Sequence, residues 1–251
     1  MGAQASKQAT NTVTSCSSSD KNETLMYSPC DNDWPWVWTI RDYKLLDWQG
    51  GGRSTGERVP ALASEQLRLP VRIHDKVYLG NTACISDINH LKDLGITGVL
   101  NVAGPQALAK KTIQALKQNN IEYHSFAAKD EYDYPMLSKH WEKALELIKN
   151  MTNSPESKLV VHCQAGLNRS GLLVTSYYMI STETPVLEAV RYVRRHRGNS
   201  ALRNPGFQEQ LVALARETGL LGNQPGTAGS ILPGVKPPQS ESNWWITSKT
   251  A

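Results

Sequence analysis

The segment 158–180 constrains the fold of this 251-residue chain more than any other. Residues 158–162 form a short, very apolar run typical of a buried strand, and residues 170–180 form a longer apolar stretch typical of a buried helix. Between them, the loop from Cys163 to Arg169 reads Cys-Gln-Ala-Gly-Leu-Asn-Arg. This order of strand, glycine-containing loop and helix predicts an anion-binding site, because loop N–H groups and a helix N-terminus can point into one concavity.

The residue types in this loop indicate a phosphoryl group as the anion and a cysteine as the nucleophile. Arg169 has a planar guanidinium that can bind two phosphoryl oxygens at once. The positive field of the loop favours the thiolate form of Cys163, which is the nucleophilic form. Gly166 permits a backbone turn that a bulkier residue would resist. The predicted phosphate-binding residues are Gln164, Ala165, Gly166, Leu167, Asn168 and Arg169.

Strand-like and helix-like patterns alternate from about residue 66 to residue 222, which predicts one α/β domain. We expect strands at 71–79, 96–102, 121–127 and 158–162. We expect helices at 86–94, 105–118, from 138 onward, at 170–180 and 184–197, and a last helix that follows residues 204–206 and ends at Gly219. This domain is expected to contain the functional site, since the loop with Cys163 lies inside it.

The two flanking regions have a different composition. Residues 1–65 are mostly polar and are predicted to be a largely disordered extension, and residues 223–251 are a Gly-, Pro- and Ser-rich tail predicted to be flexible. A Trp-rich segment, 34–48, interrupts the extension. Trp34, Trp36 and Trp38 alternate in the way that suits an extended strand with one aromatic face. This face could pack on the domain, bind a partner or lie at a membrane interface, and we favour packing.

Charge and cysteine usage argue against several classes of protein. The net charge of +4 is too small to indicate a nucleic-acid partner. The four cysteines show no CxxC pair and no histidine spacing typical of zinc, so we expect no metal or other cofactor. No apolar run approaches the roughly 18 residues of a transmembrane helix. A reducing, cytoplasmic location is the simplest expectation.

The first six residues, Met-Gly-Ala-Gln-Ala-Ser, fit the N-myristoylation pattern with Gly2 as the acceptor. A single myristoyl chain gives only marginal, reversible membrane binding. No polybasic stretch follows, because Lys7 is the only basic residue before Lys21. We therefore expect weak attachment to the cytosolic face of a membrane.

The residues from His162 to Ser170 match the HCxxGxxR[ST] loop, and in this the chain resembles the cysteine-based protein tyrosine phosphatases. Three further segments are similar to the dual-specificity phosphatase domains of that superfamily: 77–81, 94–103 and the Asn-Pro-Gly-Phe sequence at 204–207, which is followed by Gln210 and Leu211. The resemblance spans roughly residues 69–217. It implies a central mixed, mostly parallel sheet flanked by helices.

The same resemblance implies an activity and a set of roles. The chain is expected to hydrolyse phosphotyrosine, and phosphoserine or phosphothreonine as well, in protein substrates through a phosphocysteine intermediate. Cys163 is the nucleophile, Ser170 stabilises the departing thiolate, and His162 helps to shape the loop. Asp130, 33 residues before Cys163, is the general acid that protonates the leaving oxygen and then activates water. Asp133 and, less favoured, Glu131 are alternatives.

One residue departs from the pattern of the family. Typical dual-specificity loops carry Ser before the Arg, whereas this chain has Asn168, which is similar to RNA 5′-triphosphatase members. Phosphoinositide phosphatases usually carry lysines inside the loop, whereas this loop is neutral apart from Arg169. A phosphoprotein substrate is therefore favoured. Action on an RNA 5′-triphosphate or a phosphoinositide stays open, and so does a phosphoprotein-binding module with little turnover.

Overall fold

The computed structural model describes residues 27–41 and 68–225. A five-stranded sheet with the order β1-β2-β5-β3-β4 forms its centre. The strands are β1 Val71–His74, β2 Val77–Asn81, β3 Gly98–Asn101, β4 Glu122–Ser125 and β5 Leu159–Cys163. β1 pairs antiparallel with β2, and the other pairs are parallel. This confirms the predicted mixed, mostly parallel sheet.

The central strand β5 shows why the sheet has two apolar faces. Successive side chains of a strand point to opposite faces. Leu159 and Val161 therefore belong to one buried cluster, and Val160 belongs to the other. A strand buried on both faces needs apolar residues at every position, which explains the continuous apolar run in the sequence.

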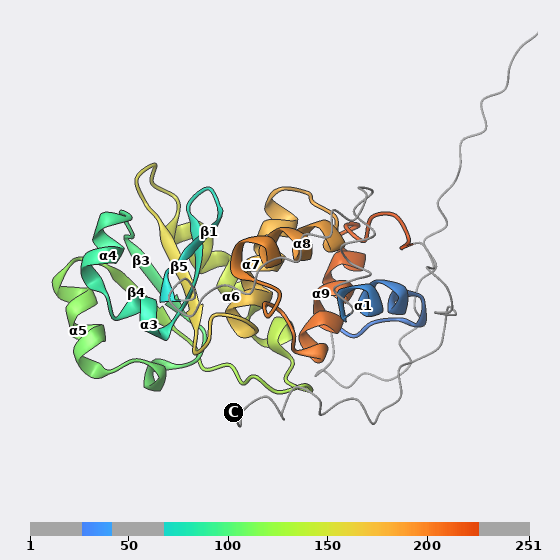
Figure 1. Cartoon of the computed structure of the whole chain (residues 1–251), viewed down its shortest axis with the longest axis horizontal. Helices are drawn as coiled ribbons and strands as arrows, with labels where there is room; N and C mark the ends of the chain where they lie inside the picture. Colours follow the sequence, from blue (N-terminus) through green and yellow to red (C-terminus); the bar gives the residue numbers. More distant parts are fainter. Residues whose placement is uncertain (1–26, 42–67, 226–251) are drawn as a thin grey trace, which may run out of the picture.

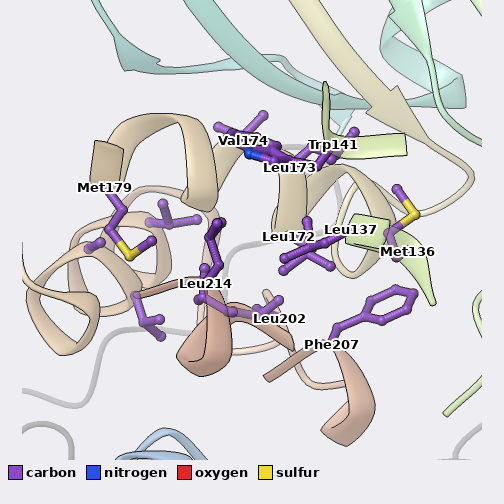
Figure 2. Packing of buried hydrophobic residues seen from close by; sticks show 14 of the residues in the cluster. Met136, Leu137, Trp141, Leu172, Leu173, Val174, Met179, Leu202, Phe207 and Leu214 are labelled. Atoms are coloured by element: carbon purple, nitrogen blue, oxygen red, sulfur yellow. The ribbon is translucent and has the colours of Figure 1, made fainter. Parts of the chain in front are cut away.

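Helices cover both faces of the sheet (Figure 1). One face carries three helices, α3 Thr82–Ile85, α4 Ile88–Asp93 and α5 Lys110–Gln118. The other face carries α6 Met136–Met151, α7 Arg169–Ser181, α8 Val186–Arg197 and α9 Pro205–Glu217. Figure 2 shows Leu172 of α7 beside Leu137 of α6, and Phe207 of α9 belongs to the same buried cluster. The larger core therefore surrounds α7, the helix that begins at the loop.

The predicted strand at 71–79 is in fact two strands. β1 and β2 form a hairpin whose turn falls on Asp75 and Lys76. Two charged residues in succession favour a solvent-exposed turn over a buried strand, and this break was missed. β1 consequently runs antiparallel at the edge of the sheet, next to the inner strand β2.

Two helix starts also differ from the prediction. Asp87, not Ser86, caps α4, because its carboxylate accepts a hydrogen bond from His90 N at 3.0 Å. Pro105 opens only a short 3₁₀ turn, η3 Pro105–Ala107, and Leu108 then adopts an extended conformation. α5 starts afresh at Lys110. Proline fits the first turn of either kind of helix, so Pro105 alone could not decide between them.

Residues 34–41 of the tryptophan segment form a helix, so the extended conformation expected for them was wrong, and residues 42–48 lie outside the described residues. α1 Trp34–Arg41 follows a short 3₁₀ turn, η1 Asp31–Asp33. Trp34, Val37 and Trp38 recur at i, i+3 and i+4, the spacing of one helical face, and all three are buried. The alternation of tryptophans was misleading because the residues between them are apolar too.

α1 packs against α8 and α9 (Figure 1). Packing on the domain was the alternative that we favoured for this segment. Trp36 Nε1 donates a hydrogen bond to Leu221 O at 2.9 Å, and Arg41 forms an ion pair with Glu209 of α9. The predicted N-terminal extension 1–65 thus contains one packed helix. Gly2 and most of the tail 223–251 lie outside the described residues. Across residues 27–41 and 68–225, no helix combines the length and apolarity needed to cross a membrane.

Candidate active site

Cys163 is the last residue of β5, the central strand, and only 1% of it is exposed. It lies in register with Asn81 at the end of β2. α7 begins six residues later at Arg169, so the loop between them runs over the carboxyl ends of parallel strands. Ligands in open α/β sheets bind at this edge. The predicted strand, loop and helix are therefore present with Cys163 at the base of the loop.

Every carbonyl oxygen from Cys163 to Leu167 accepts a hydrogen bond from another part of the chain. In order along the loop, the pairs are Thr82 Oγ1 to Cys163 O at 3.4 Å, Thr82 N to Gln164 O at 3.2 Å, Arg197 Nη2 to Ala165 O at 3.5 Å, Arg197 Nε to Gly166 O at 3.1 Å and Leu202 N to Leu167 O at 2.9 Å. In a trans peptide the C=O and the following N–H point in opposite directions. Because the carbonyls are held on the outside, the N–H groups of residues 164–168 point the other way, into the loop.

Arg197 supports two neighbouring carbonyls of this loop. It is fully buried at the end of α8, and it also donates to Leu69 O at 2.9 Å. Burial lowers the pKa of its guanidinium from the ordinary value. Gly166 makes the close approach possible: it has φ +69°, and a Cβ there would lie 2.3 Å from Gly80 O. A side chain at this position would displace the loop from both Arg197 and Gly80.

Two predicted neighbours of Cys163 lie next to it. Ser170 is fully buried, and its hydroxyl donates to Cys163 Sγ at 3.2 Å. His162 is fully buried as well, with Nδ1 3.3 Å from Cys163 O. Burial lowers the pKa of His162 from 6.5 to about 4. The imidazole is therefore neutral near pH 7, and it acts on the loop through a hydrogen bond and through shape, not through charge.

Arg169 and Asp130 approach each other at the loop. Arg169 Nη1 donates to Ala128 O at 3.1 Å, and its Nε lies 3.8 Å from Asp130 Oδ2. This Nε is buried and makes no hydrogen bond within the part of the chain that the structure describes. Asp130 is held near the loop because the backbone after β4 follows β3, with Phe126 N bonded to Asn101 O and Ala128 N bonded to Val102 O.

Of the three acidic candidates, Asp130 alone contacts the loop among the described interactions. Its Oδ2 accepts from Asn168 Nδ2 at 3.3 Å, and its Oδ1 accepts from Asn204 Nδ2 at 3.0 Å. Glu131 is exposed and pairs with Lys129 at 3.6 Å. Asp133 is exposed and lines a cavity with Tyr132 and Glu209, away from the loop. Of the three candidates, the structure thus brings Asp130 to the loop.

A comparison with known families agrees with this geometry. The family model described as dual specificity phosphatase, catalytic domain, matches residues 77–217, which is more than half of the chain. The chain belongs to the dual specificity phosphatase family. The matched dual specificity phosphatase domain contains β2 to α9, and with them the loop, Asp130 and Asn204.

Individual relatives agree with this family membership. Dual specificity protein phosphatase 26 of Homo sapiens is 34% identical over 140 residues, which cover 56% of this chain and 64% of the relative. The chain thus spans just under two thirds of that protein. Dual specificity protein phosphatase 13B of Mus musculus is 31% identical over 176 residues, 64% of this chain and 87% of the relative. In structure, the Yvh1 phosphatase domain from Chaetomium thermophilum shares the fold with a TM-score of 0.52 at 21% identity, covering 60% of this chain and 97% of that domain.

The sequence did not identify three residues that organise the site. Thr82, Arg197 and Asn204 come from β2–α3, the end of α8 and the start of α9, all remote from the loop in the sequence. One signal for Arg197 was present: it falls seven residues after Val190, on the apolar stripe that also contains Val193. A charged residue on a buried helix face needs partners, and here these partners are the loop carbonyls.

Proposed function

We propose that this dual specificity phosphatase is an active enzyme that hydrolyses phosphotyrosine, and phosphoserine or phosphothreonine as well, in protein substrates. The observation that carries the proposal is the convergence of four groups on one loop. Cys163 Sγ accepts from Ser170 at 3.2 Å, and Arg169 Nε lies 3.8 Å from the carboxylate of Asp130. A nucleophile, an anion clamp and an acid at one site are what phosphoryl transfer through a covalent intermediate requires.

In the first step, the thiolate of Cys163 attacks phosphorus. The S–P bond forms as the bond from phosphorus to the leaving oxygen breaks, and the carboxyl proton of Asp130 moves to that oxygen. Arg169 and the inward N–H groups of residues 164–168 stabilise the charge on the phosphoryl oxygens. The products are the dephosphorylated protein and a phosphocysteine.

In the second step, water attacks phosphorus and the S–P bond breaks. Asp130, now ionised, accepts the proton of the water. The electron pair of the S–P bond returns to Cys163 as a thiolate, and the Ser170 hydroxyl stabilises it by hydrogen bonding. The products are inorganic phosphate and the free enzyme.

A protein substrate is favoured over other phosphate esters by the character of the loop. Gln164, Ala165, Leu167 and Asn168 are all neutral, so Arg169 is the one cationic side chain of the loop. A highly charged inositol phosphate or triphosphate would call for more cations than this. The relatives described above carry the name dual specificity protein phosphatase, which supports the same substrate class.

The test is a panel of substrates assayed by phosphate release with the full chain. The panel holds matched phosphotyrosine, phosphothreonine and phosphoserine peptides, a triphosphorylated RNA and a phosphoinositide in detergent. We expect turnover of the phosphopeptides, with phosphotyrosine fastest, and none with Cys163→Ser. Faster turnover of the RNA or the lipid would contradict the proposed substrate class. If the wild type bound a phosphopeptide tightly but released no inorganic phosphate, the protein would be a phosphoprotein-binding module instead.

The role of Asp130 is tested with Asp130→Asn. We expect kcat/KM to fall by about 10²- to 10⁴-fold, the usual contribution of a general acid. Asp133→Asn is the matched control, since Asp133 is an exposed carboxylate of the same segment. Full activity of Asp130→Asn, or an equal loss in Asp133→Asn, would contradict the assignment.

We also propose that Gly2 is N-myristoylated and that the protein attaches weakly to the cytosolic face of a membrane. The support for this is the sequence Met-Gly-Ala-Gln-Ala-Ser at positions 1–6. Expression of wild type and Gly2→Ala in eukaryotic cells with an alkyne-tagged myristate should label the wild type alone. The labelled form should be enriched in the membrane fraction. Equal membrane fractions for the two proteins would contradict the attachment.

A further inference from the structure

Asn168 stands in the loop where the helix α7 begins, but it does not act as a helix cap. An asparagine at an N-cap usually accepts a hydrogen bond from the second or third N–H of its own helix. The side chain of Asn168 makes no such bond. Its Oδ1 instead accepts from Arg203 N at 2.9 Å and from Asn204 N at 3.1 Å, both in the segment before α9.

These two bonds fix the orientation of the amide. Because both partners of Oδ1 are N–H donors, the oxygen must face residues 203–204 and the NH₂ group must face the other way. The NH₂ group then donates to Asp130 Oδ2 at 3.3 Å. Asn168 thereby joins the loop, the segment before α9 and the loop that carries Asp130.

Asn204 holds the second oxygen of the same carboxylate. Its Oδ1 accepts from Gly206 N at 3.1 Å and from Phe207 N at 3.4 Å, so this asparagine does cap its helix. Its Nδ2 is consequently directed to Asp130 Oδ1, at 3.0 Å. Each carboxylate oxygen of Asp130 is thus held by one neutral amide, and the orientation of each amide is fixed by two backbone N–H groups.

We propose that Asn168 is a positioning residue that holds Asp130 in place to protonate the leaving group; this rests on the proposed function, in which Asp130 is the general acid. An asparagine amide carries an acceptor oxygen and a donor NH₂ group that point in different directions. One side chain can therefore accept hydrogen bonds from the segment before α9 and donate one to Asp130. Asn168 then aligns the acid, and its presence in the loop does not indicate an RNA substrate.

A purely structural role predicts different kinetics. If Asn168 only stabilised the loop, its loss would weaken the hydrolysis of every substrate by the same factor. If it aligns the acid, its loss must matter most where protonation of the leaving oxygen matters most. Esters of weakly acidic phenols need this proton, whereas a 4-nitrophenolate leaves readily without it.

The experiment measures kcat/KM for phenyl phosphate and for 4-nitrophenyl phosphate with the full chain. For Asn168→Ala we expect a loss of roughly tenfold with phenyl phosphate, part of the full effect of a general acid, and a loss of less than about twofold with 4-nitrophenyl phosphate. Asn204→Ser, which keeps a capping hydroxyl but removes the amide donor, should show the same dependence on the leaving group. Asn119→Ala, at the end of α5 and far from the loop, is the matched control and should behave as the wild type.

The effect of Asn168→Ala on kcat/KM is then measured in the Asp130→Asn background. When one residue acts through another, the second substitution adds little. We expect Asn168→Ala to cause less than about a twofold further loss there. Losses of equal size for both substrates, or a full tenfold loss without Asp130, would overturn the positioning role while leaving the phosphatase intact. Absence of turnover in the wild type would overturn the proposed function and this role together.

Discussion

The hydroxyl of Ser170 donates a hydrogen bond to Cys163 Sγ at 3.2 Å, and both groups are buried. This bond joins the last residue of β5 to the first turn of α7, across the loop that they enclose. It is directed at the atom that leaves in the second chemical step. The thiolate that this atom becomes accepts a stronger hydrogen bond than a thioether-like S–P sulfur does.

Replacement of Ser170 by alanine should therefore slow the second step. A hydrogen bond to a charged group is worth about 1.5–3 kcal/mol, so we expect kcat to fall by about 10- to 100-fold. The pre-steady-state release of phenol and of phosphate from phenyl phosphate measures the rates of the two steps. A burst of phenol should appear because the second step becomes slower than the first. Ser176→Ala is the matched control, because Ser176 is a buried serine of the same helix and has no hydrogen-bond partner among the described residues. An equal loss in both variants would contradict the role of Ser170.

Replacement of Arg197 by methionine should collapse the loop. The variant removes the donors to Ala165 O, Gly166 O and Leu69 O at once. A buried acceptor left without its partner costs about 1–3 kcal/mol, so we expect a drop of a few kcal/mol in the free energy of unfolding. We expect a loss of phosphate affinity as well, because the N–H groups lose their orientation. Arg195→Met, an exposed arginine of the same helix, should change neither the stability nor the affinity.

His162 should make the protein less stable as the pH falls. Its pKa is about 4 in the folded protein because burial disfavours the charged form, and it returns to about 6.5 when the chain unfolds. The unfolded state therefore binds more protons below pH 6.5, and stability is lost from that pH down to about 4. Between pH 7 and pH 5 the group should cost the wild type about 2 kcal/mol.

Urea unfolding of the wild type and His162→Asn at the two pH values measures this contribution. Asparagine keeps a donor near the position of Nδ1 but does not titrate. The other titrating groups contribute to both proteins and cancel in the difference. The same loss of stability on acidification in both proteins would contradict the assignment to His162.

The helix α1 should be part of the folded unit. Trp36 is 8% exposed, and its indole N–H donates to Leu221 O at 2.9 Å. We expect Trp36→Ala to lower the free energy of unfolding by about 3–5 kcal/mol. Trp36→Phe keeps most of the ring and loses the hydrogen bond, so a loss of about 1 kcal/mol is expected. Denaturant unfolding measures both, and wild-type stability in Trp36→Ala would show that α1 does not dock in solution.

The loop could be predicted because its parts are contiguous. The apolar run of β5, Gly166, Arg169 and the apolar helix α7 lie within about 25 residues, and local spacing determines how they meet. Asp130 was assigned from the resemblance to the dual-specificity phosphatases and from its place after a predicted strand. It lies near the loop because β4 pairs with β3, and neighbouring parallel strands end at the same edge of the sheet.

What holds the loop could not be predicted from local spacing. Thr82, Arg197 and Asn204 reach it by tertiary contacts from three other segments. The predicted conformation of residues 34–41 was wrong for a related reason. In this short apolar run the patterns of a strand and of a helix are both satisfied, and packing against α8 and α9 decides between them.

The meaning of Asn168 changed most between sequence and structure. In the sequence it suggested a different substrate, because it replaces the usual serine. In the structure its amide bridges Asp130 and the backbone before α9. The proposed positioning role rests on these contacts, and the sequence alone could not identify Asp130 as the partner of Asn168.

The most direct test of the whole account is to trap the covalent intermediate. A reaction of the Ser170→Ala variant with a phosphotyrosine peptide is stopped in denaturant during turnover, and the digested protein is analysed by mass spectrometry. The account predicts one added phosphoryl group on the peptide that contains Cys163 and none on the peptide that contains Cys84, the other free buried cysteine of the described residues. Phosphate release with no phosphoryl group on Cys163 at any time point would contradict it.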